Sequence, residues 1–171
     1  KLALTERRGE EAANQLLATY CAAFPAVYRD TVSVRIAVRD IQTMDLLSEQ
    51  QPITVRLYRP VEADSNALRL RVYRMGGPIP LSGSLPMLEN MGVTVLDEQS
   101  YTLDRGNAGT VHIHDFGMMS MIDLPDISAV RPLFEDGFGK VWRRETESDG
   151  FNRLILAAGL SSDEIIVLRA Y

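Results

Sequence analysis

A period of two in the hydrophobic residues between Pro52 and Met121 constrains the fold of this chain more than any other feature. The segments 53–59 and 67–75 each alternate apolar residues with arginine, threonine or tyrosine. Because successive side chains of a strand point to opposite faces, each segment is predicted to be a strand with one apolar face. The polar linker 61–66 predicts that the two strands form a hairpin. The apolar residues of the pair are Ile53, Val55, Leu57, Leu68, Leu70 and Val72.

A second predicted hairpin follows, with a short helix before it. Strands are expected over 93–103 and 110–118, joined by the turn Gly106–Gly109. Between the two hairpins a helix is expected over 81–91, and Gly92 stands where a left-handed helix C-cap belongs. The four strands therefore come in two pairs, with one helix between the pairs.

Segments with a helical period of 3.6 precede and follow the strands. On the N-terminal side we expect helices over 5–24 and 34–47, the second capped by Ser33. On the C-terminal side we expect an amphipathic helix through Val130 and Trp142, a helix over 151–158, and a last helix that opens with a capping box of Ser161 and Glu164. The last helix reaches the end of the sequence without a stop signal, so we expect the protein to continue beyond it.

The order of these elements predicts an α+β fold built on a ferredoxin-like, four-stranded antiparallel sheet. The last three strands and the two helices that follow the hairpins supply all of this motif except its final strand. The strand 53–59 can fill that place from the N-terminal side. The predicted spatial order is therefore 53–59, 67–75, 110–118, 93–103, with helices on one face and further helices flanking the sheet at both ends of the chain.

Composition argues against several classes of protein. The formal net charge of -5 argues against a general nucleic-acid binder, which is usually basic. The single cysteine, Cys21, excludes an intramolecular disulfide and fits a reducing compartment. The sequence shows no signal peptide and no apolar stretch that is long enough to span a bilayer. We expect a cytoplasmic protein that binds neither nucleic acid nor a membrane.

Polar side chains of the strands are expected to gather on the sheet face away from the helices. Arginine and tyrosine are enriched at protein interfaces, so this face is predicted to dock against another domain. Two alternatives stay open: a solvated surface, and an RNA-binding sheet on which arginine and tyrosine stack against bases. The residues assigned to this face are Arg56, Tyr58, Arg69, Arg71, Tyr73, His112 and His114.

The His112-x-His114 pair lies on one predicted strand, so both side chains point to the same side, as some metal hydrolases require. These are the only histidines, and Asp115 is expected to point the other way, so a third ligand would have to come from elsewhere. We therefore predict no metal site and keep a metal-dependent hydrolase as an alternative. We also predict no catalytic residue, because no nucleophile triad, carboxylate pair or phosphate-binding loop is visible.

Gly76 and Gly77 precede the helix expected over 81–91. Exposed amides at a helix N-terminus bind carboxylates or phosphates, which makes this pair a candidate effector site. A simple turn between strand and helix is the alternative, and the pair matches neither a phosphate-binding loop nor a dinucleotide fingerprint.

From Ser33 onward the sequence resembles the large bacterial NAD-specific glutamate dehydrogenases. The resemblance is carried by the segments 53–60, 69–82, 85–92 and 111–116. The tail 165–171 resembles the start of the catalytic region of that family. The second segment, together with the Leu-Pro-Met-Leu-Glu-Asn-Met-Gly helix over 85–92, is quite specific.

This resemblance implies an ACT-like domain, an amino-acid-sensing variant of the ferredoxin-like fold that is permuted here. It implies an N-terminal helical segment over 1–50, an ACT-like domain over 51–145, and helices over 146–171 that lead into a catalytic domain. The parent enzyme would convert L-glutamate and NAD to 2-oxoglutarate, ammonia and NADH, and would form a homo-oligomer.

The resemblance also implies that this region is not catalytic. The catalytic lysine and the dinucleotide fold of the family have no counterpart here, because the only lysines, Lys1 and Lys140, lack a glycine-rich partner. We therefore expect no cofactor in this chain, NAD elsewhere in the parent enzyme, other domains of the same chain as partners, and a small amino acid as the possible effector.

Overall fold

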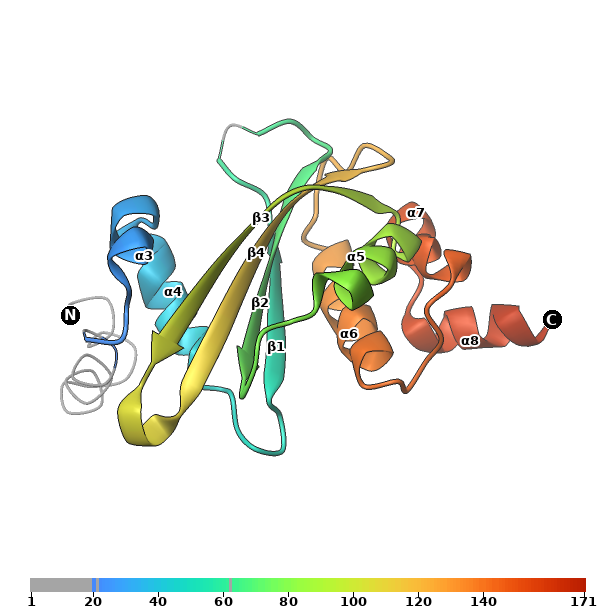
Figure 1. Cartoon of the computed structure of the whole chain (residues 1–171). Helices are drawn as coiled ribbons and strands as arrows, with labels where there is room; N and C mark the ends of the chain where they lie inside the picture. Colours follow the sequence, from blue (N-terminus) through green and yellow to red (C-terminus); the bar gives the residue numbers. More distant parts are fainter. Residues whose placement is uncertain (1–19, 21, 62) are drawn as a thin grey trace. The chain divides into compact units, whose positions relative to one another are not determined.

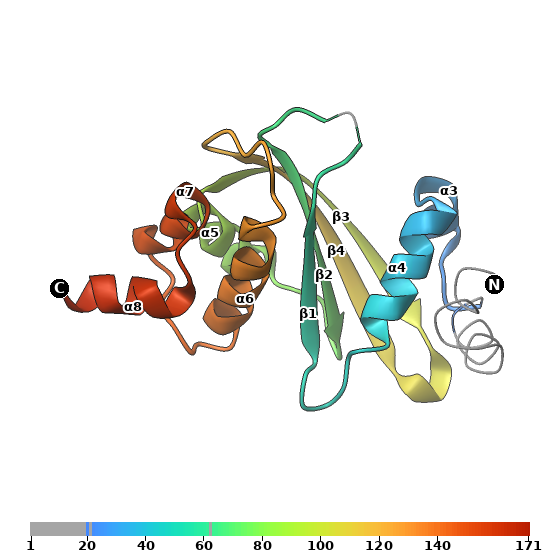
Figure 2. The ribbon, with the colours of Figure 1, turned by 180° about the vertical axis from the view of Figure 1, so that it is seen from behind.

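The computed structural model describes residue 20 and the ranges 22–61 and 63–171. Most of the helix expected over 5–24 lies outside these residues. Figures 1 and 2 show the described helices and strands from opposite sides. The helices are α3 (Ala26–Thr31), α4 (Val34–Met44), α5 (Leu81–Asn90), α6 (Val130–Trp142), α7 (Leu154–Ala158) and α8 (Ser162–Ala170). The strands are β1 (Ile53–Tyr58), β2 (Ala67–Met75), β3 (Val93–Asp104) and β4 (Thr110–Ser120), with 3-10 turns η1 (Gly106–Ala108) and η2 (Gly150–Arg153).

The four strands form one antiparallel sheet in the order β1-β2-β4-β3 (Figure 1). This confirms the predicted α+β class and the predicted strand order. Strands β1 and β3 lie at the two edges, and the long strands β2 and β4 lie between them. The edge strand β1 is tied to α6, because the Leu57 amide donates a 2.8 Å hydrogen bond to Glu135.

Local signals in the sequence explain where the helices begin and end. The Ser33 hydroxyl accepts a hydrogen bond from the Ile36 amide and caps α4. Gly92 follows α5 with φ +86°, a left-handed conformation that glycine adopts without steric cost. Ser161 and Glu164 form the expected capping box of α8. Pro86 lies inside α5, at its sixth position.

Contacts divide the described chain into two units, and every strand contributes residues to both. The first unit holds α3, α4, residues 73–78 and residues 100–113. In it, α3 and α4 pack against one side of the sheet residues and bury Tyr73, so aromatic rings fill much of this core. The buried members are Tyr20, Ala23, Phe24, Tyr28, Ile41, Met44, Tyr73, Tyr101, Leu103, Val111 and Ile113.

The second unit holds α5 to α8 and the remaining strand residues. Its helices pack closely because Gly137 of α6 faces the buried Ile155 of α7: a Cβ at position 137 would lie 2.5 Å from the Ile155 Cδ1 atom. Figure 2 shows α5, α6, α7 and α8 as neighbours within this unit. No helix within the described ranges is long and apolar enough to cross a membrane.

Candidate functional site

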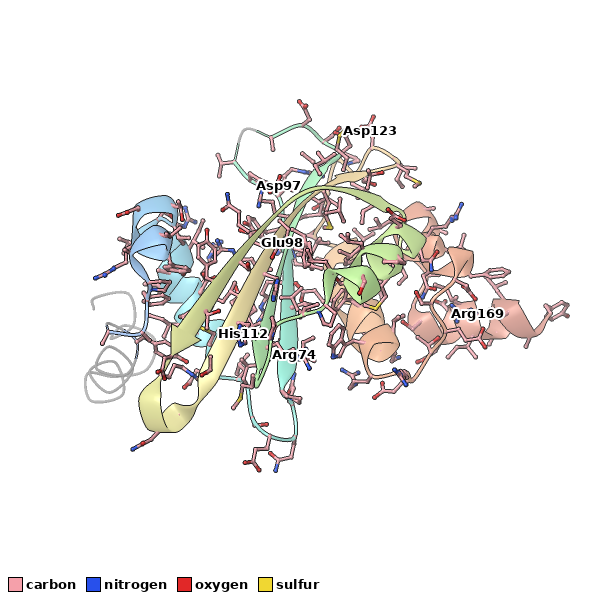
Figure 3. All side chains as sticks on the ribbon, viewed as in Figure 1. Arg74, Asp97, Glu98, His112, Asp123 and Arg169 are labelled. Atoms are coloured by element: carbon pink, nitrogen blue, oxygen red, sulfur yellow. The ribbon has the colours of Figure 1, made fainter. Side chains whose placement is uncertain are left out.

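Asp115 of β4 is the centre of a buried ionic cluster in the second unit. One carboxylate oxygen accepts a 2.9 Å hydrogen bond from Arg69 Nε, and the other accepts a 2.9 Å bond from Arg71 Nε. The Tyr58 hydroxyl donates to the same carboxylate at 3.2 Å. Arg69 also reaches the exposed Asp97 at 3.0 Å (Figure 3). Two guanidinium groups therefore face two carboxylates, and the cluster is electrically balanced.

Burial and the neighbouring charge keep the Tyr58 phenol in its neutral form. Burial is the larger cause and the Asp115 charge the next, and together they raise the pKa of Tyr58 to about 12. A neutral phenol keeps its proton available for donation to the Asp115 carboxylate. At neutral pH the cluster is a fixed set of donors around one acceptor.

His114 points to the opposite face of β4 from Asp115, as the alternation of side chains requires. Its Nε2 atom accepts a 3.0 Å hydrogen bond from the Ile79 amide, in the loop that leads into α5. Its Nδ1 atom lies 2.8 Å from the carboxylate of Glu98. Because Nε2 accepts a hydrogen bond, the network assigns the ring proton to Nδ1. Both ring nitrogens therefore have partners, and the contact at Nε2 holds the loop before α5.

The structure does not place all seven predicted docking residues on one face. Tyr58, Arg69 and Arg71 gather around Asp115, whereas His112 and His114 share the opposite face of β4, so the predicted grouping is corrected there. Both faces of this strand carry buried residues, and a polar residue on it therefore cannot be assigned to a face by its polarity.

The other predicted docking residues have separate partners. His112 Nδ1 lies 3.1 Å from the Thr102 hydroxyl. Arg56, on the edge strand β1, has its Nη1 atom 3.5 Å from the carboxylate of Glu135 in α6. Tyr73 is buried in the first unit, where its hydroxyl donates a 2.6 Å hydrogen bond to Asp40 of α4. Tyr28 of α3 donates to the same carboxylate. The N-terminal helices of this chain therefore cover Tyr73, and the docking role of the other residues stays a prediction.

Sequence reasoning missed Asp115 and Asp40 as the acceptors around which these residues gather. The alternation of β4 placed Asp115 opposite to His114, but the arginines were assigned to the His114 face, so the alternation set Asp115 apart from Arg69 and Arg71. For Asp40 no signal was available, since an aspartate in a helix gives no indication that two tyrosines from other elements will approach it.

The two glycines of the candidate effector site differ in their backbone. Gly76 has φ +90°, and its amide donates to the Thr110 carbonyl at 3.3 Å, so this position favours glycine. Gly77 has no such constraint, and a Cβ there would meet no atom within 4 Å. The Arg74 guanidinium closes the turn by donating to the Pro78 carbonyl at 2.7 Å. The turn is therefore ordered, with open space at Gly77.

The absence of a metal site stays a prediction, and the structure gives the arrangement of possible ligands in the part of the chain that it describes. No group of three or more His, Cys, Asp or Glu side chains there is arranged to hold a metal ion. Both ring nitrogens of His114 already have hydrogen-bond partners, so neither is open to a metal ion in this arrangement.

A four-stranded antiparallel sheet in this order, with α5 and α6 beside it, defines an ACT-like α+β module. Three sequence models of glutamate dehydrogenase match the chain: helical motif 2 over residues 3–47, the ACT3 domain over 52–125, and helical motif 3 over 146–171. The chain belongs to this region of the NAD-specific glutamate dehydrogenases.

Curated relatives agree with that assignment. The NAD-specific glutamate dehydrogenase of Halomonas elongata is 39% identical over 164 residues, which cover 95% of this chain and 10% of the relative. The corresponding protein of Pseudomonas aeruginosa is 36% identical over 169 residues, covering 98% of this chain and 10% of the relative. That of Mycobacterium tuberculosis is 29% identical over 158 residues, which are 89% of this chain and 10% of the relative. The chain therefore spans about a tenth of the length of these relatives.

Proposed function

We propose that this chain is a non-catalytic regulatory or assembly module of an NAD-dependent glutamate dehydrogenase. The observation that carries the proposal is the match of residues 52–125 to the ACT3 domain of that family. The whole enzyme would convert L-glutamate, NAD and water to 2-oxoglutarate, ammonia and NADH, with NAD bound outside this region. Its other domains and further copies of the subunit would be the partners of this module in the cytoplasm.

The effector site that we propose lies at Gly76 and Gly77, where the chain enters α5. The ligand class is a small amino acid, whose carboxylate would meet the exposed amides of the first turn of α5. Two features support this placement. The N-cap residue Pro80 has no side-chain donor or acceptor for that turn, and the space at Gly77 is open.

Thermal unfolding of the 171-residue chain against a panel of amino acids tests this function. A ligand at a hundred times its dissociation constant stabilises the fold by about 2.7 kcal/mol, which raises the melting temperature by several degrees. A selective rise with one amino acid would identify a sensor. A flat response across the panel, from a chain that melts cooperatively, would contradict the effector site and leave assembly as the role.

A pair of variants tests the placement. Gly77→Trp fills the open space and should remove the ligand-induced rise while the melting temperature of the free protein stays unchanged. Asn107→Trp adds the same bulk in the exposed turn η1 and should keep the full rise. Binding that survives Gly77→Trp would show that the ligand lies elsewhere.

A further inference from the structure

The second half of α8 presents its apolar side chains outward and its charged side chain inward. Ile166, Val167 and Leu168 are 44%, 61% and 43% exposed. After the first turn the only charged residue of the helix is Arg169, and its guanidinium is directed into the second unit. A helix on the free surface of a protein normally shows the reverse arrangement.

Specific bonds fix α8 in this orientation. Arg169, which is labelled in Figure 3, donates to Asp149 through Nε at 2.8 Å and through Nη2 at 3.0 Å. It also donates to Thr146 and Asn152. Ile165 is buried on the same side of the helix. Rotation of α8 to bury its apolar residues would break this whole set of contacts, so the outward apolar face is a built feature of the unit.

We propose that the outward face of α8, defined by Ile166, Val167 and Leu168, is a docking surface for another domain of the same glutamate dehydrogenase polypeptide. The proposal rests on the proposed function. Contiguous exposed apolar side chains mark interaction sites. Relatives of this family are about ten times longer than the matched region, so most of their polypeptide lies outside it.

The size of the face favours a domain of the same polypeptide over a second copy of the chain. A stable complex of separate proteins buries roughly 800 Å² on each partner. Three half-exposed side chains of one nine-residue helix supply only a fraction of that area. A domain on the same polypeptide avoids most of the entropic cost of bringing two molecules together, so a small apolar face is sufficient to hold it.

Cysteine labelling compares the solvent accessibility of this face in the 171-residue chain with that in the full-length enzyme. Val167→Cys is introduced into the 171-residue chain and into the full-length dehydrogenase, and each protein is treated with a maleimide. Trypsin cleavage after Arg153 and Arg169 places residue 167 in one peptide, so mass spectrometry reads its labelling without interference from other cysteines. Asn107→Cys, in the exposed turn η1, gives the reference rate in each protein, and an unchanged melting temperature verifies folding.

The quantity compared is the labelling rate of Val167→Cys divided by that of Asn107→Cys. We expect this ratio to be at least tenfold lower in the full-length enzyme than in the 171-residue chain, at every protein concentration. Equal relative rates in the two proteins would overturn the proposal. Protection that appears in the 171-residue chain as its concentration rises would overturn it in favour of a second copy.

The same preparations separate this proposal from the proposed function. Full-length protein that oxidises glutamate with NAD but leaves the thiol at position 167 unprotected contradicts the docking surface alone. Protein that protects this thiol but has no such activity contradicts the proposed parent enzyme and leaves the docking of α8 standing.

Discussion

Asp115 accepts hydrogen bonds from two guanidinium groups, and the Arg71 side chain is only 5% exposed. Removal of the carboxylate breaks the buried ion pair with Arg71, which typically costs about 3–5 kcal/mol. We therefore expect Asp115→Ala to lower the free energy of unfolding by about that amount. Urea unfolding measures the difference.

Asp97→Ala is the matched control for Asp115→Ala, because Asp97 pairs with Arg69 but is 53% exposed. An exposed pair contributes less than about 1 kcal/mol, so this variant should remain close to the parent chain. Equal losses in the two variants would show that burial does not set the strength of the cluster.

The Tyr58 phenol gives the cluster a dependence on alkaline pH. Its pKa in the folded chain is about 12, raised from 10.0, first by burial and next by Asp115. The fold therefore favours the neutral phenol over the ionised one. The stability that Tyr58 contributes through this preference is complete below pH 10, declines between pH 10 and about 12 as the unfolded chain ionises first, and is lost above that range.

Tyr58→Phe tests this pH dependence, because phenylalanine cannot ionise. We expect the difference in unfolding free energy between the parent chain and Tyr58→Phe to change by about 1–2 kcal/mol across that alkaline window. Chemical denaturation at several pH values measures it. A difference that stays constant with pH would contradict the assigned pKa.

The assignment of single residues to faces was the least predictable feature of the sequence. An alternating strand reveals its apolar face when the other face is polar, as in β1, where the exposed Arg56 separates the buried Val55 and Leu57. Strands β2 and β4 are buried on both faces, so Tyr73 and His114 have polar side chains in buried positions. Their partners differ in what the sequence could show: Glu98 lies on the predicted hairpin partner of β4, whereas Asp40 comes from a helix that no local pattern connects to Tyr73.

At the scale of elements, the strands and their order followed from the period of two and the hairpin lengths. Helix ends followed from Ser33, Gly92 and Ser161, because caps act locally. Close approaches between helices could not be predicted from the sequence. A glycine within a helix looks the same in the sequence whether or not a neighbouring helix packs against it. Gly83 of α5 and Gly137 of α6 illustrate the difference.

Alanine at these two glycines should have opposite effects. Alanine at position 137 would collide with the buried Ile155, and overpacking of this kind costs about 1–3 kcal/mol. Alanine at position 83 meets no atom within 4 Å, so its better helix propensity should stabilise the chain by roughly 0.5–1 kcal/mol. Thermal unfolding of both variants measures the two shifts, and a stabilised Gly137→Ala variant would contradict the observed packing.

At the scale of the whole molecule, the structure weakens the RNA-binding alternative. Arg69 and Arg71 are paired with the Asp115 carboxylate, and Tyr73 is buried, so the expected stacking surface is not available to bases. With a formal net charge of -5, the chain should show no affinity for labelled single-stranded RNA in fluorescence anisotropy at about 50 mM salt. Binding that weakens steeply as salt rises would restore the alternative.

The use of arginine in place of lysine affects how the neighbours of this region can be located by chemical cross-linking. Arg59 donates to the carbonyls of Ser65, Leu124 and Pro125, and Arg169 joins α8 to several side chains of the segment 146–152, which the planar fork of arginine allows. The chain has 16 arginines but only two lysines, Lys1 and Lys140, and the latter pairs with Asp136 and Asp163. Amine-reactive cross-linkers will therefore yield almost no distance restraints within this region, and reagents directed at carboxylates will be needed to locate its neighbours.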